Sequence, residues 1–538
     1  MKRKRLIILS IFAAFSLFGC DTDSNNSSEI MDSSILDGSV SETTNSNGIS
    51  ESVNIGTNDS SDNIFKTYSE EDYNKNFPTY KQLSEKYPDK TILVWTIQET
   101  LYERNYPFYT YEVNEYLDSL GCDYCVCFYP IRADRSEDET KSYTDYVTEM
   151  IENGDQVDIV YSSFTSVDEA GNNAFHKYIY NGVFEPLNKY FETELGMKLY
   201  ENMPAEHWQA LTVDGSIYGI DGSMHSLSDD YGYFINSELA KKYKFDIATP
   251  IEDQIDILQE VKSNENCDVF VSYNDFNTAS YIVDIKEITG AVYFDEDEMK
   301  AKCILDNPEF MDKLRFMYDL KQKNYLVDPD HTTTDTFFIL RTNLAGGKEH
   351  YKNFDTVDIT YNNRTVTTIP VFIGDTTVRS SYMATGISSS SEHKDQAFEI
   401  LALTQTDPYL NNLLTYGKEG EDYHLADGKV DTIINPVSLD RFPNRMICYP
   451  TSSTLITSEE YKAIYKNANC SETVGFAFDG RDVIPQSSAT SRLFMTFDFL
   501  SVDDLDTAIK DLRSQLEQSG IKDVIDACNQ QYEEYKNE

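Results

Sequence analysis

TILVW (residues 91–95) is an apolar, β-prone run, and it opens the part of the chain that decides the fold. YEVNEYLDSLG (residues 111–121) follows with helical periodicity and precedes a second strand-like run, CDYCVCFYPI (residues 122–131). SYTDYVTEMIENG (residues 142–154) again has apolar residues at helical spacing, and VDIVYSS (residues 157–163) supplies a third strand. This β-α-β-α-β order predicts an α/β fold with a parallel, doubly wound sheet.

Local signals at the ends of elements support this division. Ser142 and Asp145 predict a capped start for the second helix, and Gly154 predicts its end. Asp214-Gly215, between two short β-prone runs, predicts a hairpin with a type I′ turn. An N-cap followed by Pro predicts helix starts at Thr249-Pro250, Asn307-Pro308 and Asp407-Pro408. A further strand is expected at RTVTTIPVF (residues 364–372), and helices are expected at residues 502–518 and 521–535.

The chain begins with a segment typical of a secretory signal. A basic stretch at residues 2–5 precedes an apolar stretch at residues 6–18, which is too short to span a bilayer as a mature helix. LFGC (residues 17–20) resembles the lipobox of bacterial lipoproteins, in which the Cys carries the lipid and the leader is cut before it. We therefore predict a lipoprotein signal peptide over residues 1–20 with lipidation at Cys20. An ordinary signal peptide with an incidental Cys is the alternative.

The segment after the signal is polar and acidic. Residues 21–64 contain 12 Ser, 7 Asn, 4 Thr and 9 acidic residues, and no Lys, Arg or aromatic residue. Such a composition cannot bury enough apolar surface to offset the entropy lost on ordering. We therefore predict a disordered, Ser/Asn-rich tether and lead-in over residues 21–89, which suits a protein that works near a membrane or within a cell wall.

Length and charge limit what the rest of the chain can be. About 470 residues are too many for one hydrophobic core and predict two domains. The formal net charge is -47, so the long-range field repels nucleic acid and other anionic polymers. We interpret the acidic excess as a means of solubility outside the cell.

Three cysteines lie close together in one apolar run, at Cys122, Cys125 and Cys127, and superficially resemble a metal cluster. No second Cys pair and no nearby His completes a set of four ligands. Strand alternation places Cys125 and Cys127 on one face, so we expect buried strand cysteines. A disulfide from Cys122 stays open at this point.

The sequence contains no common catalytic or nucleotide-binding motif. Its seven His residues are scattered singly, and carboxylate pairs arise by chance among 92 acidic residues. DEDE (residues 295–298) lacks the Gly of an EF-hand loop and predicts a solvated turn. We expect neither an enzyme, nor a cofactor, nor a bound metal.

Four longer stretches resemble a known family in their order and spacing. They are HWQALTVDGSIYGID (residues 207–221), YGYFINSELAKKYKFDIATPIEDQIDIL (residues 231–258), SEHKDQAFEILALTQTDPYLNNLLTYGKEGEDYHLADGKV (residues 391–430) and GFAFDGRDV (residues 475–483). The chain resembles the bacterial extracellular solute-binding lipoproteins of family 1, related to maltose-binding protein. It is most similar to the branch for oligosaccharides such as aldouronates. Asp221 stands where the family usually has Pro.

The resemblance implies an α/β, two-lobe fold of the periplasmic-binding-protein type, with doubly wound sheets and three interlobe crossovers. By position, lobe one is expected at residues 90–228 plus 384–445, and lobe two at residues 229–383 plus 446–538. The implied protein is a monomeric, lipid-anchored receptor on the extracellular face of the bacterial cell membrane. It captures an oligosaccharide for the permease subunits of an ABC importer. A receptor for another solute such as a peptide, or a secreted lipoprotein glycosidase, is the alternative.

A sugar site needs aromatic platforms for the flat ring faces and polar groups for the hydroxyls. In this architecture the ligand is expected at strand ends and crossovers. The candidate ligand-binding residues at such positions are Trp95, Gln98, Ser163, Phe164, Asp221, Tyr231, Tyr273, Asp275, Arg379 and Tyr382. The alternatives are a core position for Trp95, a surface position for Asp221 and ordinary loop roles for residues 163–164.

Overall fold

The computed structural model describes most of the chain beyond residue 76. The described ranges are 77–99, 109–132, 142–162, 174–222, 231–272, 285–332, 334–344, 355–362, 364–373, 377–379, 383–433, 444, 446–449 and 458–537. The signal peptide, Cys20 and most of the tether lie outside these ranges, and their assignment stays a prediction. Within the described ranges, no helix combines the length and the apolarity needed to cross a membrane.

A four-stranded sheet in the order β16-β3-β1-β2 forms the centre of the first lobe. Its strands are β1 (Thr91–Glu99), β2 (Tyr124–Arg132), β3 (Ile159–Tyr161) and β16 (Thr385–Ile387). β1 lies between β2 and β3 and is parallel to both, whereas β16 joins antiparallel to β3. The parallel β-α-β-α-β order predicted for the first strands is therefore confirmed, and the fourth strand comes from far downstream.

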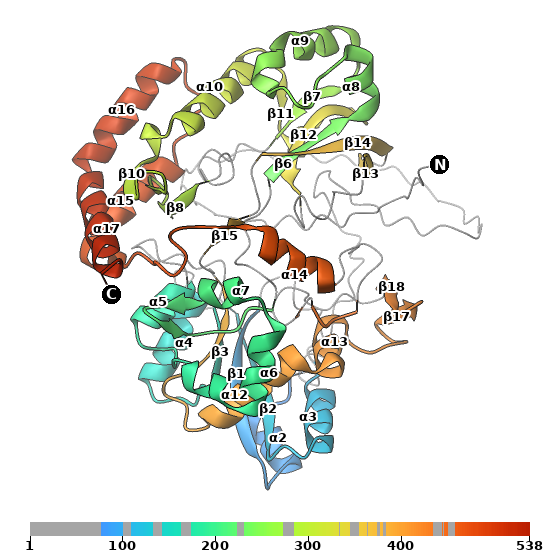
Figure 1. Cartoon of the computed structure of the whole chain (residues 1–538), viewed down its shortest axis with the longest axis vertical. Helices are drawn as coiled ribbons and strands as arrows, with labels where there is room; N and C mark the ends of the chain where they lie inside the picture. Colours follow the sequence, from blue (N-terminus) through green and yellow to red (C-terminus); the bar gives the residue numbers. More distant parts are fainter. Residues whose placement is uncertain are drawn as a thin grey trace, which may run out of the picture.

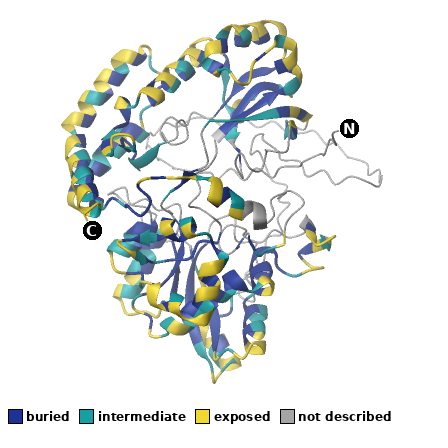
Figure 2. Ribbon diagram, viewed as in Figure 1, coloured by how far each residue is buried: buried dark blue, intermediate teal, exposed yellow. Residues whose placement is uncertain are grey.

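Helices surround this sheet in the lower half of Figure 1. They are α2 (Tyr80–Lys86), α3 (Thr110–Ser119), α4 (Tyr143–Glu152), α5 (Ala174–Tyr180), α6 (Glu194–Asn202), α7 (Ala205–Ala210), α12 (Lys394–Thr406) and α13 (Pro408–Tyr416). The core of the lobe combines Trp95 and Phe128 from the strands with Leu117, Val147 and Phe398 from the helices. Figure 2 shows the result, with buried strands inside and helices whose outer faces are exposed.

The predicted helix ends are mostly confirmed. Ser142 and Asp145 form a reciprocal capping box at the start of α4, and Gly154 follows its end with a φ of 81°. Asn307 and Asp407 accept hydrogen bonds from the backbone of α10 (Pro308–Gln322) and α13, with Pro in the first turn of each helix.

The cap predicted at Thr249 is wrong in detail. Pro250 itself occupies the N-cap position of the short 3-10 helix η4 (Ile251–Gln254), and no side chain caps it. The Thr249 hydroxyl instead donates to the carboxylate of Asp246 at 2.8 Å. The Thr249 side chain therefore bonds to a carboxylate in the loop instead of capping the helix.

The predicted hairpin and the buried cysteines are confirmed. β4 (Thr212–Val213) and β5 (Ser216–Ile217) pair through Asp214 and Gly215, whose φ angles of 48° and 71° suit a type I′ turn. Cys125 and Cys127 are buried in β2. All cysteines in the described part of the chain are free thiols.

A six-stranded mixed sheet in the order β11-β7-β12-β6-β14-β13 forms the second lobe. Its strands are β6 (Tyr231–Asn236), β7 (Asp268–Val271), β11 (Leu326–Val327), β12 (Phe337–Asn343), β13 (Val357–Tyr361) and β14 (Arg364–Phe372), of which β14 is the predicted RTVTTIPVF strand. β7 is parallel to β11 and β12, whereas β6 is antiparallel to β12 and β14. The sheet is therefore parallel in one half, and the β13-β14 hairpin completes its other half.

A smaller antiparallel sheet and the outer helices complete this lobe. The remaining elements are β8 (Lys286–Thr289), β9 (Val292–Asp295), β10 (Lys300–Cys303), α8 (Ser237–Tyr243), α9 (Ile255–Asn264), α15 (Ile484–Met495), α16 (Leu505–Gln518) and α17 (Ile521–Tyr535). The two predicted C-terminal helices are α16 and α17. Figure 1 shows α10 and α15–α17 along one outer edge, where α17 packs on β9 and β10. DEDE forms the end of β9 and the turn to β10, as expected, but only Asp297 and Glu298 are exposed. Glu296 is half-buried and accepts hydrogen bonds from Ser471 and Thr473.

The order of elements along the chain shows where it leaves each lobe. It passes from β5 to β6, returns from β14 to β16, and passes again to α15 after α14 (Ser458–Asn467). Met446, Ile464, Tyr465 and Val474 belong to the core of the first lobe, although residues 446–538 were expected in lobe two. We therefore propose that the third crossover lies just after Val474. The disorder predicted up to residue 89 is wrong at its end, because α2 is a capped helix whose Leu83 is buried in a cluster with Ile92 and Cys125 of the first sheet. We keep the other predicted boundaries.

The free edge of β2 generates a test of the first lobe. Asn114 of α3 accepts a hydrogen bond from the Val126 N–H at 2.7 Å and donates to the Val126 carbonyl at 2.9 Å, as a neighbouring strand would. Asn114→Ala leaves both buried backbone groups unpaired and is expected to cost about 2 to 5 kcal/mol of unfolding free energy, measured by urea denaturation. Glu115→Ala, on the exposed side of α3, is the control and is expected to cost less than about 0.5 kcal/mol. Equal costs for the two variants would contradict this role of Asn114.

Candidate functional site

The carboxyl ends of β1 and β3 define one edge of the first sheet. β16 begins at the same edge, where Thr385 pairs with Tyr161. Ile220 also reaches this edge, because it exchanges two backbone hydrogen bonds of 2.9 Å with Thr385. The first crossover, where it leaves the first lobe, is therefore hydrogen-bonded to the second crossover, where it returns to that lobe.

The matching edge of the second sheet is built from four strands. β7 and β12 end there, and Tyr231 begins the antiparallel strand β6 opposite Asn343. β14 ends there as well, with Phe372 opposite Gly232. The chain leaves the first edge at Gly222 and enters the second at Tyr231, so the strand ends of both sheets lie at the crossovers. In open α/β sheets, ligands bind beyond such strand ends.

Arg341 is a charged residue at the second-lobe edge. It is 7% exposed in β12, and its guanidinium donates to the Ser272 hydroxyl at 3.1 Å, just past the end of β7. A buried guanidinium at a strand end offers several fixed N–H donors, which suits recognition of hydroxyl or carboxylate oxygens.

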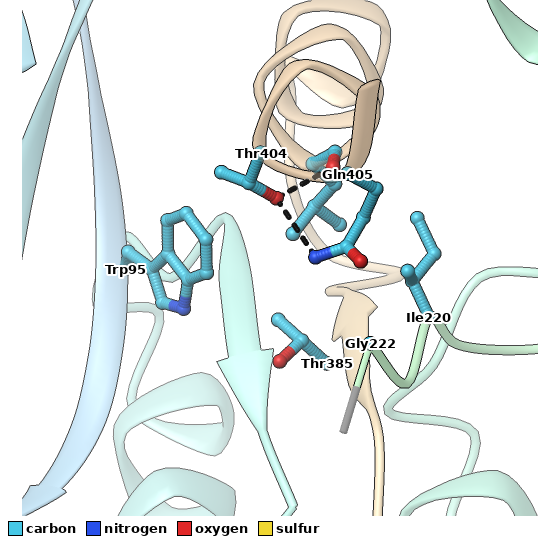
Figure 3. Close-up of a pocket in the computed structure, with 7 residues that line it drawn as sticks. Trp95, Ile220, Gly222, Thr385, Thr404 and Gln405 are labelled. Atoms are coloured by element: carbon cyan, nitrogen blue, oxygen red, sulfur yellow. Dashed lines mark hydrogen bonds between the residues drawn. The ribbon is translucent and has the colours of Figure 1, made fainter. Parts of the chain in front are cut away.

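Trp95 is enclosed in the first lobe. Its side chain is 1% exposed, and its ring centroid lies 5.4 Å from that of Phe128. A cavity of about 10 Å³ lies beside the indole, between Thr385 and Gln405 (Figure 3), and this volume holds about one water molecule. Trp95 therefore occupies the core position that was the alternative to a ligand-binding role. A contact between Trp95 and a ligand stays a prediction.

The end of α12 supplies the polar wall of this cavity. The Gln405 side-chain amide donates to the Thr404 hydroxyl at 3.3 Å, as Figure 3 shows. Asn411 donates to the Thr404 carbonyl and Asn444 to the Gln405 carbonyl, each at 2.8 Å. These buried amides donate hydrogen bonds to backbone carbonyls in the last turn of α12. The carbonyls therefore have partners although the helix ends inside the lobe.

The structure places only some of the other predicted site residues. Gln98 and Asp221 are both buried near the first-lobe edge, at 6% and 4% exposure, so Asp221 is not the surface residue of the alternative interpretation. Tyr231 starts β6, and Arg379 follows β15 (Thr377–Val378) and is half-buried. Outside the described residues lie Ser163, Phe164, Tyr273, Asp275 and Tyr382. The ligand-binding role of all these residues stays a prediction.

The sequence interpretation missed Arg341 and the pair Thr404 and Gln405. FFILRTN (residues 337–343) contains a single Arg inside an otherwise apolar run, which is a usable signal for a buried charge. The pair gave no signal, because Thr and Gln in a helix usually face solvent. Among the described residues, no group of three or more His, Cys, Asp or Glu side chains is arranged to hold a metal ion.

Comparison with protein families and curated proteins gives two matches. Residues 472–537 match a domain of unknown function, DUF3502. A carbohydrate ABC transporter substrate-binding protein of Streptococcus pneumoniae is 24% identical over 420 residues, which cover 71% of this chain and 82% of the relative.

Solved structures match over most of the chain. The N-glycan transport solute-binding protein NgtS of Streptococcus pneumoniae has a TM-score of 0.63 at 19% identity, covering 83% of this chain and 99% of its own. Its complex with Man5GlcNAc has a TM-score of 0.54 at 19% identity, covering 84% and 99%. An HMO-binding solute-binding protein of Bifidobacterium longum infantis has a TM-score of 0.53 at 12% identity, covering 83% and 99%. The chain therefore has the two-lobe α/β fold of solute-binding proteins, and the resemblance found in the sequence is confirmed.

The close approach of the first two crossovers can be tested at Gly386. A Cβ atom there would lie 2.6 Å from the Phe184 ring and 2.8 Å from the Tyr218 carbonyl. Gly386→Ala is expected to cost about 1 to 3 kcal/mol of unfolding free energy, measured by chemical denaturation, because the backbone must move apart. Gly290→Ala is the matched control, since its Cβ would come closest to the flexible side chain of Met495, at 3.1 Å, and would lie at an ordinary contact distance of 3.6 Å from Ser491 Cα. An unchanged stability in Gly386→Ala would contradict the tight packing at this point.

Proposed function

We propose that this protein is the substrate-binding component of a carbohydrate ABC importer and that it captures an oligosaccharide between its two lobes. The observation that carries the proposal is a relative with this role that matches 71% of the chain and is itself covered over 82% of its length. Solved structures of the same fold include complexes of NgtS with Man1GlcNAc and Man5GlcNAc. The names of these relatives are those of transport proteins, which favours a receptor over an enzyme.

The proposed site combines the strand ends of both lobes. The hydrogen-bonding groups come from Gln98 and Asp221 of the first lobe and from Arg341 of the second. They include both donors and acceptors, and a sugar hydroxyl can bond to either because it donates one hydrogen bond and accepts others. Closure about the crossovers then desolvates the ligand, and the permease subunits recognise the closed form. The ligand enters the first lobe beside the wall that contains Trp95.

The location of the protein follows from the same role. A receptor for an importer works on the outer face of the membrane, and the predicted lipid at Cys20 would hold it there. The residues between Cys20 and α2 would then act as the tether between the lipid and the first lobe. We propose that the folded part works as a monomer, since one chain supplies both lobes of the site.

Ligand binding is expected to stabilise the purified protein. At a ligand concentration 100 times the dissociation constant, mass action adds about 2.7 kcal/mol, which a thermal-shift assay detects. The panel should contain mannose- and N-acetylglucosamine-based oligosaccharides beside other oligosaccharides and peptides. A shift with peptides alone would contradict the carbohydrate assignment, and no shift with any oligosaccharide would contradict the proposed function.

The chain has only two Trp residues, which allows a sharper test of the site. Trp208 is buried in α7 rather than placed at a strand end, and its ring stacks on that of Tyr200 with 5.4 Å between the centroids. In Trp208→Phe, the remaining Trp95 fluorescence should therefore change on binding. Arg341→Met should weaken binding at least about tenfold, which is the loss of one charged hydrogen bond.

The matched control for Arg341 is Arg364→Met, because Arg364 is exposed and pairs with Asp335 at the surface. The affinity of Arg364→Met for the ligand should equal that of the unmodified protein. Equal affinities for both Arg variants would remove Arg341 from the site without affecting the assignment as a receptor.

Replacement of Cys20 tests the anchor. Cys20→Ala removes the sulfur that would carry the lipid, so the protein should leave the membrane fraction of the producing cells, measured by fractionation and immunoblotting. Its affinity for ligand in solution should stay the same, because residues 21–76 separate Cys20 from the first described residues of the lobe. Full retention of the variant in the membrane fraction would contradict lipidation at this residue.

A further inference from the structure

The third crossover contains a sharp transition between the two cores. Val474 is buried in the core of the first lobe, and Phe476, two residues later, is buried in the core of the second. Gly475 between them has a φ of 90°, a left-handed conformation that favours Gly. The chain therefore passes from one lobe to the other at a single residue, which makes Gly475 the natural pivot of this crossover.

Lys286 spans this pivot. It lies in β8 of the second lobe, and its Nζ donates to the carbonyls of Thr473 and Phe476 at 2.9 and 3.0 Å. One acceptor precedes Gly475 and the other follows it, so a single amino group holds both sides of the turn. Nζ also lies 5.2 Å from the centroid of the Phe476 ring.

Charged and titratable groups from both lobes face this amino group. They are Glu296 from the β9-β10 turn, Cys528 from α17, Arg379 beside β15 and His176 from α5. Glu296 is itself held at the crossover, because it accepts hydrogen bonds from the hydroxyls of Ser471 and Thr473. β15 pairs with β19 (Asn469–Cys470), so two crossovers run side by side here.

The surroundings of the amino group affect its proton, although the Lys286 side chain as a whole is only half-buried. Burial lowers the pKa of Lys286 to about 7; the charge of Glu296 opposes this shift and that of Arg379 adds to it. Burial, assisted by the charge of Lys286, lowers the pKa of His176 to about 3, so His176 is neutral under physiological conditions. A neutral amine retains two N–H donors, which is the number of carbonyls that Lys286 bonds.

We propose that Lys286 is the positioning residue of the hinge, that its neutral amine holds the two sides of the Gly475 turn, and that proton binding loosens them. Protonation favours a state in which the ammonium reaches water, because the charged form loses more solvation in the packed site. Ligand capture requires the lobes to close about this crossover, so the affinity for ligand depends on the same proton. This last step rests on the proposed function, whereas the behaviour of the hinge does not.

The direction of the pH effect follows from linkage. An exposed lysine has a pKa of about 10.4, so between about pH 7 and about pH 10.4 the opened or unfolded state binds more protons than the native state. The native hinge is therefore most stable at the upper end of this window. Its stability falls as the pH is lowered toward about 7 and levels off below that value.

Hydrogen exchange of the ligand-free, full-length protein tests the proposal. Lys286→Gln keeps two N–H donors without a titratable group, and Lys321→Gln on the exposed face of α10 is the matched control for charge. After correction for intrinsic rates, residues 471–481 of the unmodified protein should lose protection about tenfold to twentyfold from about pH 8.5 to about pH 7. Lys321→Gln should show the same loss, and Lys286→Gln should show none.

Two outcomes would overturn the proposal: a loss of protection in Lys286→Gln equal to that in the unmodified protein, or no loss in either. If Lys286→Gln fails to fold, the unmodified protein alone still tests the proposal. The change in hydrogen-exchange protection between the two pH values is then compared for residues 471–481 and for α16. A parallel change of both segments would then reject a local hinge.

The functional arm uses Man5GlcNAc as the probe, over the same pH range. The affinity of the unmodified protein should change with pH, and that of Lys286→Gln should stay constant. If this sugar does not bind at any pH, the proposed specificity fails while the exchange data still decide the role of Lys286. A pH-dependent hinge with pH-independent affinity would reject the coupling between them.

Discussion

The antiparallel pairing of β16 with β3 is the contact on which the two-lobe arrangement depends. Thr385 pairs with Tyr161 and Ile387 with Ile159, although the whole six-stranded sheet of the second lobe lies between them in the sequence. The first lobe is therefore complete only after the chain has passed through the second and returned. Such a long-range pairing has a high cost in loop-closure entropy, so the cores of both lobes must supply the favourable free energy.

Buried polar groups fix this returning strand in place. The Asp158 carboxylate accepts hydrogen bonds from the Val94 N–H at 2.8 Å and from the Ser391 hydroxyl, and the Asp158 carbonyl accepts from the Ser388 N–H at 2.9 Å. One residue thus connects β1 with the segment that follows β16. Charge-assisted hydrogen bonds of this kind are strong and directional, so they determine the register where apolar packing alone would allow a shift.

Local sequence signals predicted the parts of the structure that depend on nearby residues. The capping box at Ser142, the turn at Gly215 and the strand at residues 364–372 are of this kind. The lobe to which residues 446–474 belong depends on packing between distant segments, and no local pattern distinguishes a helix that covers one core from a helix that covers the other. Arg341 was missed for a related reason, since its proposed role comes from the strand end at which β12 places it.

The contacts around Gly475 indicate how the hinge combines strength with motion. Tyr535 of the second lobe donates to the Val474 carbonyl at 3.1 Å, whereas Tyr180 of the first lobe donates to the Ala477 carbonyl at 2.7 Å. Each lobe therefore reaches across the pivot to hold the side that packs in the other core. A carbonyl oxygen accepts hydrogen bonds over a broad range of directions, so these hydroxyls can follow a rotation without losing their partners. In the proposed closure, a rotation about this point would change angles rather than the number of hydrogen bonds. Open and closed forms would then be close in free energy, and a ligand could decide between them.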